Sequence, residues 1–260
     1  MKQALIKMIA GAGLIGILSA CNLVTYEDQQ VYTLDAGELE TFVIDQDQGD
    51  VTIVGVAETA EITVTSHVAV TSEEMEQAEQ FAERNLSLEL SSEGTTGYLT
   101  TEVHQENQAA QGGQHLTIEV PQELMIQYKQ HEGEMSITDV TGDLEIQHGR
   151  GAMKLERIQG NVTISDGAGT IDIVELAGDL SINANAGTIK IADSVGDVKL
   201  IAGSGDVDVS NQEGSVSVRS GSGNVTIDTV SGDVTILENR EGTLTLDNIS
   251  GTITEPGQEG

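Results

Sequence analysis

A glycine recurs at every ninth position from Gly133 to Gly251, with a single step of ten in the whole series. Where a full strand follows the glycine, the residues two and four places after it are aliphatic, beginning with Met135 and Ile137. A spacing of two puts both side chains on one face of a strand, and a fixed period makes each strand repeat its neighbour. The sequence therefore predicts an all-β fold, a β-solenoid (β-helix) of nine-residue strand units, over residues 133–254, followed by a tail at 255–260.

The repeat also has a period of eighteen, because the corners between strands are of two kinds. Seven places after alternate glycines stand residues that tolerate left-handed backbone: Gly149, Gly167, Asn185, Gly203, Gly221 and Asn239. These positions predict tight left-handed turns. The other corner is often apolar, as at Val140 and Ile158, and is expected to point inward. Each coil then has two strands and two unlike corners, and residues eighteen apart become neighbours.

One ladder of charges supports this register. The residues Lys154, Asp172, Lys190 and Asp208 follow one another at intervals of eighteen and alternate in sign. Stacked coils would place each charge beside an opposite one, an arrangement worth at most about 1 kcal/mol per exposed pair.

Residues 31–132 are rich in strand patterns but irregular. The segments 49–54 and 61–65 alternate in the same way as the later repeats and predict degenerate coils of the solenoid. Polar residues from His104 to Gln114 predict a loop.

One short helix is expected within this irregular region, over about 73–84. Ser72 is followed by two acids in a capping-box-like start. Met75, Ala78, Phe81 and Ala82 then give an apolar stripe at helical spacing.

Residues 1–20 have the pattern of a secretory signal: Lys2 and Lys7, no acid, an apolar stretch, and small residues before Cys21. The sequence Leu18-Ser19-Ala20-Cys21 resembles the lipobox of bacterial lipoproteins, and Cys21 is the only cysteine in the chain. The resemblance implies cleavage between Ala20 and Cys21, lipidation of the Cys21 thiol with acylation of the new N-terminus, and a membrane anchor followed by a tether at 21–30. The alternatives are an ordinary signal peptide and an N-terminal membrane anchor.

The expected location is the bacterial cell envelope. Residue 22 is Asn rather than the Asp that resembles an inner-membrane retention signal, so the outer membrane is favoured where the cell has two. The formal charge is −32, and without Lys2 and Lys7 nine basic residues remain against 43 acidic ones, a charge near −34. Such a charge repels nucleic acid, which is therefore not an expected partner.

Two clusters resemble chemical sites. His148 and Asp166 lie eighteen apart and are expected to stack as a solvated corner pair rather than to catalyse a reaction. Directly after alternate glycines comes a second ladder: Asp143, Asn161, Asp179, Asp197, Ser215 and Asp233. Its aspartates Asp143, Asp179, Asp197 and Asp233 are weak Ca²⁺ candidates, and the favoured alternative is hydrogen bonding to turn backbone.

No phosphate-binding loop, zinc spacing or nucleophile motif occurs, so no cofactor is expected. The chain has no Trp and few other aromatic residues, whereas carbohydrate-cleaving β-helices usually present an aromatic platform. The sequence therefore predicts a protein that is not an enzyme.

The Gly-Asp-Val-x-Ile units, with Gly-Ser-Gly corners and the preceding segment from Leu116 to Pro121, resemble a family of bacterial envelope proteins with adhesin-like β-strand repeats of unknown function. The resemblance covers about Gly49 to Ile253 and implies a binding or scaffold module. A lipid-anchored, adhesin-like protein that binds an envelope protein or a glycan is the first hypothesis. An envelope-stress regulator that acts by protein contact is the second, and a polysaccharide-active enzyme is the third.

Overall fold

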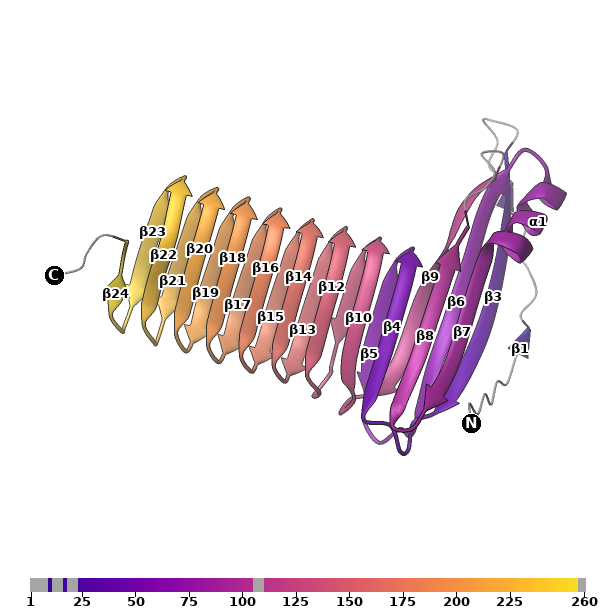
Figure 1. The fold of residues 1–260 in the computed structure, drawn as a ribbon, viewed down its shortest axis with the longest axis horizontal. Coiled ribbons are helices and arrows are strands. Elements are labelled where there is room, and N and C mark those ends of the chain that lie inside the picture. Colours follow the sequence, from indigo (N-terminus) through magenta and orange to yellow (C-terminus); the bar gives the residue numbers. More distant parts are fainter. Residues whose placement is uncertain (1–8, 11–15, 18–22, 105–109, 257–260) are drawn as a thin grey trace. The chain divides into compact units, whose positions relative to one another are not determined.

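The computed structural model describes residues 9–10, 16–17, 23–104 and 110–256. The chain divides into two compact units, Met1–Gly133 and Glu134–Gly260. Both consist almost entirely of strands, and one helix lies in the first unit (Figure 1).

Unit 1 contains two sheets and α1 (Met75–Asn85). In the first sheet β3, β6, β9 and β5 are neighbours in that order, and in the second β10, β4, β8 and β7. Two short strands, β1 and β2, pair antiparallel with β3. The strand bounds are β1 (Ile9–Ala10), β2 (Gly16–Ile17), β3 (Val24–Asp35), β4 (Thr41–Gln48), β5 (Val51–Val56), β6 (Glu61–Ser72), β7 (Leu86–Glu93), β8 (Thr96–Val103), β9 (Ala110–Pro121) and β10 (Met125–Glu132).

Unit 2 is the predicted solenoid. Its odd-numbered strands pair in parallel with one another, its even-numbered strands do the same, and each partner along β11 to β21 lies eighteen or nineteen residues away. The strand bounds are β11 (Met135–Thr138), β12 (Leu144–Arg150), β13 (Met153–Gln159), β14 (Val162–Ala168), β15 (Ile171–Ala177), β16 (Leu180–Ala186), β17 (Ile189–Val195), β18 (Val198–Ser204), β19 (Val207–Glu213), β20 (Val216–Ser222), β21 (Val225–Val230), β22 (Val234–Glu241), β23 (Leu244–Ile249) and β24 (Ile253–Thr254).

The aliphatic pairs of the repeat form the core of unit 2, as predicted. From Met135 to Ile236 every residue two or four places after a repeat glycine is buried. Leu244 and Leu246 on β23 are only half-buried. Since these side chains lie on the last long strand of the stack, they are covered from one side only.

The ten-residue step of the repeat is absorbed by a bulge. The register between β20 and β22 shifts after Val218, where Arg219 lies opposite Glu238. Leu237 is thereby left without a partner position and is 52% exposed. A bulge of one residue keeps all later aliphatic side chains on the inner face.

The corners differ from the prediction. Left-handed backbone occurs at non-glycine residues of the opposite corner, eighteen or nineteen apart: Asp139, Arg157, Glu175, Asp193, Asn211, Thr229 and Asn248. Each directly precedes the inward corner residue, so the left-handed step turns the chain and sends Val140, Ile158 and their equivalents into the core.

Gly167 shows why glycine occupies the corner that was assigned to a left-handed turn. Its φ lies outside the left-handed region, but a Cβ there would lie 2.3 Å from the carbonyl oxygen of Gly149 on the preceding coil. Close stacking, and not backbone conformation, therefore requires a residue without a side chain at this position.

The predicted charge ladder has the expected register. Lys154 lies opposite Asp172, and Lys190 lies between Asp172 and Asp208. Lys154 forms its ion pair at 2.8 Å with Glu156 of its own strand.

The expected helix is confirmed, with bounds Met75–Asn85 instead of 73–84. Its capping box was wrong, because Ser72 is the last residue of β6 and the N-cap, Glu74, makes no side-chain capping bond. Ala78 and Phe81 on the inner face of α1 pack against Val70 of β6 and Ala110 of β9.

Three expectations for unit 1 were wrong. Residues 24–30 are not a tether, because they form the first half of β3 and pair with β6. Residues 110–114 are not a loop, because they belong to β9; residues 105–109 lie outside the described residues. β6, which contains the segment 61–65, runs antiparallel to both neighbours and is not a solenoid coil, whereas β5 pairs in parallel with β9 as a coil would.

Candidate functional site

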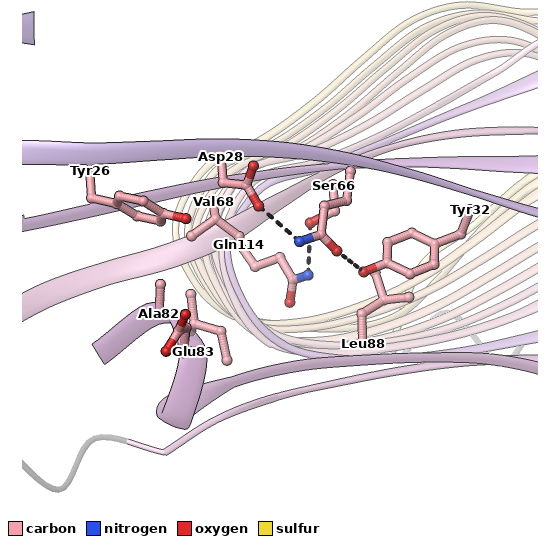
Figure 2. A pocket seen from close by; sticks show the side chains of 11 residues that line it. Tyr26, Asp28, Tyr32, Ser66, Val68, Ala82, Glu83, Leu88 and Gln114 are labelled. Atoms are coloured by element: carbon pink, nitrogen blue, oxygen red, sulfur yellow. Dashed lines mark hydrogen bonds between the residues drawn. The ribbon is translucent and has the colours of Figure 1, made fainter. Parts of the chain in front are cut away.

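A pocket of about 220 Å³ lies in unit 1 between the β3, β6 and β9 strands and the segment formed by α1 and β7 (Figure 2). Its polar lining residues are Tyr26, Asp28, Gln30, Tyr32, Ser66 and Gln114. The remaining lining is apolar at Val68, Ala82, Leu86 and Leu88, with Glu83 of α1 beside them.

The alternation of β3 explains how these side chains meet. Tyr26, Asp28 and every second residue after them up to Tyr32 share one face of the strand, and Glu27 between them is exposed on the other face. Long antiparallel pairing with β6 fixes this register over all of β3.

Hydrogen bonds hold the polar wall in one arrangement. The Tyr32 hydroxyl donates to the Gln30 side-chain oxygen, and Gln30 Nε2 donates to Asp28 Oδ2 at 2.8 Å. Gln114 Nε2 donates to Ser66 Oγ at 2.7 Å. Figure 2 shows both chains of hydrogen bonds along the same side of the pocket.

A hydrogen bond to its backbone holds Gln114 in place. Its backbone carbonyl accepts a hydrogen bond from Gln46 Nε2 at 3.1 Å, and Thr101 donates to Gln46 Oε1 at 2.7 Å. Gln114 is only 4% exposed, and its Oε1 atom is buried without a hydrogen-bond partner. An unpaired buried acceptor costs about 1–3 kcal/mol, so this position favours any ligand that brings a donor.

The pocket lining has a net negative charge. Burial and then the carboxylates of Asp28, Glu79 and Glu83 raise the pKa of Tyr26. Burial and then Asp28 raise the pKa of Tyr32. Both phenols therefore stay protonated at neutral pH, and the lining contains two acids and no Lys, Arg or His.

The His148 and Asp166 side chains do meet, but they are not solvated. His148 Nδ1 lies 2.8 Å from Asp166 Oδ1, and the two side chains are 0% and 1% exposed. On the even-numbered strands β12 to β18, the sixth place after the glycine lies on the same strand face as the second and fourth, and the equivalent residues of later coils are the buried Ala184 and Ala202. A substrate cannot reach this pair, so its role is structural.

The aspartate ladder bonds to backbone, as the favoured alternative predicted. Asp143 Oδ1 accepts from the Asn161 amide at 2.7 Å, and Asp179 Oδ1 accepts from the Asp197 amide at 2.9 Å. Asp197 and Asp233 accept in the same way from the next coil, at 2.9 and 2.7 Å.

These bonds run between coils, so the ladder holds the stack in register. A calcium ion at this ladder would compete with the backbone amides for the same carboxylates. No group of three or more His, Cys, Asp or Glu side chains with metal-ligand geometry occurs among the described residues.

Ala20 and Cys21, the predicted cleavage and lipidation positions, lie outside the described residues. Within the described part of the chain, no helix is both long and apolar enough to cross a membrane. Lipidation at Cys21 stays a prediction from the sequence motif.

The family of the chain follows from a match to a known family model. The Toastrack DUF4097 model matches residues 39–256, which include most of unit 1 and nearly all of unit 2. The chain belongs to this family. The Toastrack region thus begins just before β4 and ends after β24, and it leaves β3 outside its bounds.

Solved structures from three organisms match most of the chain at low sequence identity. A candidate cell adhesion protein from Clostridium sporogenes is 9% identical, with 88% of this chain and 98% of that chain covered and a TM-score of 0.32. A candidate adhesin from Bacteroides fragilis is 13% identical, with 92% and 100% covered and a TM-score of 0.33. A candidate lipid binding protein from Parabacteroides distasonis is 13% identical, with 87% and 96% covered and a TM-score of 0.31.

The search of curated proteins found no match.

Proposed function

We propose that the chain is a non-enzymatic, lipid-anchored protein of the bacterial cell envelope whose Toastrack solenoid is an adhesin-like binding or scaffold module. The observation that carries the proposal is the Leu18-Ser19-Ala20-Cys21 sequence, which holds the only cysteine of the chain directly after a basic and apolar leader. Several acyl chains at Cys21 would hold the protein on a bilayer, since each buried methylene contributes about 0.8 kcal/mol.

The outer faces of the solenoid support the binding role. One outward lane consists of residues that each lie directly beside the next on the adjacent strand: Glu145, Thr163, Ser181, Lys199 and Ser217. Neighbouring strands lie about 4.8 Å apart, so the lane repeats hydrogen-bonding groups at a regular interval. A regular polar surface of this kind suits an extended partner such as a glycan or an envelope protein.

Metabolic labelling with a palmitate analogue tests the anchor. We expect the full chain to be labelled and to sediment with membranes, and Cys21→Ser to lose both properties. A matched control returns the thiol elsewhere: Cys21→Ser combined with Ser87→Cys places it on an exposed position of β7. Labelling of the control, or membrane retention of Cys21→Ser, contradicts the proposal.

Crosslinking in intact cells tests the binding role. We expect the chain to capture an envelope protein or glycan, and substitutions of Thr163 and Ser217 by Glu on the outward lane to reduce capture without loss of strand content by circular dichroism. Unchanged capture by these variants would exclude this surface as the binding face.

A further inference from the structure

The pocket beneath α1 joins an acidic wall, held in place at Asp28, to an apolar wall in one small space. Asp28 and Glu83 supply two carboxylates, whereas Val68, Leu86 and Leu88 supply aliphatic contacts. Its volume of about 220 Å³ suits a ligand of few heavy atoms. We propose that this pocket binds a small primary alkylammonium ion, with the ammonium at the acidic wall and the alkyl chain against the apolar one.

The charge of the ligand follows from the lining. Burial and then the Asp28 carboxylate raise the pKa of both Tyr26 and Tyr32, so the charge of Asp28 acts on both tyrosines of this wall. No lining side chain carries a positive charge. A cation therefore gains Coulomb energy here that a neutral or anionic molecule lacks.

The acceptor without a partner in this pocket favours a ligand that has N–H donors. Gln114 Oε1 is buried and unpartnered, while the amide nitrogen of the same side chain is committed to Ser66 Oγ. Figure 2 shows this oxygen directed away from Ser66, toward the space between Ala82 and Leu88. A primary ammonium has three donors, so it can satisfy this oxygen and a carboxylate at once.

Preorganisation strengthens the site. Gln30 donates to Asp28, and Tyr32 donates to Gln30, so the carboxylate is held in place before a ligand arrives. Little side-chain entropy is then lost on binding.

Titration calorimetry on the full chain in detergent tests the proposal with four probes of similar size. We expect pentylammonium to bind and pentanol, pentanoate and tetramethylammonium to bind at least tenfold more weakly. Pentanol lacks the charge, and tetramethylammonium has the charge without N–H donors. Equal binding of pentanol, or no binding of pentylammonium, overturns the proposal.

A blocked lysine, Nα-acetyl-lysine methylamide, distinguishes two sources of the same group. Binding of pentylammonium alone identifies a free amine as the ligand class. Binding of the blocked lysine as well identifies a site that also accepts a lysyl side chain. Either result supports an alkylammonium site, and binding of neither contradicts it.

Two variants and one control locate the binding. Asp28→Asn should weaken pentylammonium binding about tenfold or more, because the charge of the acceptor is lost, and Glu83→Gln, at an exposed position, should weaken it by up to about fivefold. Glu27→Gln removes the same charge from the opposite face of β3 and should change the affinity less than twofold. Glu83 is exposed on α1, so its variant keeps the test valid if Asp28→Asn fails to fold.

A spectroscopic measurement completes the test. Methyl resonances of Val68, Leu86 and Leu88 should shift on addition of pentylammonium, and those of Val209 in unit 2 should not. Shifts spread evenly over both units would indicate nonspecific association with an acidic protein and would overturn the assignment.

Discussion

Replacing Gly187 by Ala is the sharpest test of how tightly the coils are stacked. Gly187 has φ +121°, and a Cβ there would lie 1.7 Å from the carbonyl oxygen of Gly169 on the preceding coil. An ordinary contact at this point needs well over 3 Å, so the two coils would have to separate by more than 1 Å. The hydrogen bond from the Gly169 amide to the Ala186 carbonyl oxygen joins these two coils at 3.1 Å and opposes this movement.

The expected cost has two parts. An alanine held at this φ costs about 1–3 kcal/mol of backbone strain. Separating the coils breaks one or two backbone hydrogen bonds at a corner, each worth about 1–3 kcal/mol when its partner is left buried. Together these give a loss of about 2–9 kcal/mol, a large part of the 5–15 kcal/mol that is typical of folded domains.

Urea unfolding followed by circular dichroism measures this loss. Gly113→Ala is the matched control, because a Cβ at Gly113 meets no atom within 4 Å, and its effect should stay within about 0.5 kcal/mol. If Gly187→Ala costs less than about 1 kcal/mol, or no more than the control, the close stacking described here is wrong.

Three further predictions concern the corners and the buried pair. Thr229 is β-branched and sits at φ 59°, so Thr229→Asn should stabilise unit 2 by about 0.5–1 kcal/mol, whereas Thr226→Asn on the same strand should not; equal effects would contradict the left-handed assignment. His148→Ala leaves the buried Asp166 carboxylate without its partner and should lower the free energy of unfolding by about 3–5 kcal/mol. The double variant with Asp166→Ala should recover much of this loss, since Ala184 and Ala202 occupy the equivalent places in later coils. Additive losses would contradict the pairing. Hydrogen bonds from Arg157 lower the pKa of Asp139 below the usual 3.8, so the pair stabilises the fold above that pH and loses its effect as pH falls through the folded pKa. The difference in urea midpoint between the wild type and Arg157→Gln should therefore be present at pH 7 and shrink at pH 3. A difference independent of pH would argue against this ion pair.

The periodic part of the fold could be predicted because each position of the repeat accepts one kind of side chain. A residue two or four places after a glycine is enclosed by the same positions of adjacent coils, so only an aliphatic side chain serves there, as at Ile173. The eighteen-residue period would have indicated that His148 and Asp166 are buried, since Ala184 and Ala202 stand at the same position of later coils.

The backbone conformation of the corners could not be predicted because glycine is needed there for two different reasons. At Gly187 both a positive φ and a close carbonyl exclude a side chain, and at Gly167 only the close carbonyl does. The left-handed residues themselves, such as Arg157 and Glu175, have ordinary side chains that give no sign of their backbone. Local sequence therefore located each corner but not its geometry.

The pocket was missed for a related reason. The polar residues from Glu27 to Gln30 have the composition of a tether, and only their pairing with β6 makes them a strand. Once β3 is a strand, its alternation brings Asp28 and Gln30 to one face beneath α1, a segment more than forty residues away in sequence. A contact of that kind depends on the tertiary fold and leaves no local pattern.

Distances between spin labels on one outward lane test the stacking of the coils most directly. In a Cys21→Ser background, labels at positions 145 and 217 are four coils apart, and labels at 145 and 235 are five coils apart. A stack in register predicts backbone separations of about 19 and 24 Å, an increase of about 4.8 Å for eighteen residues. Equal distances for the two pairs, or an increase that differs clearly from one strand spacing, would contradict a solenoid of eighteen-residue coils.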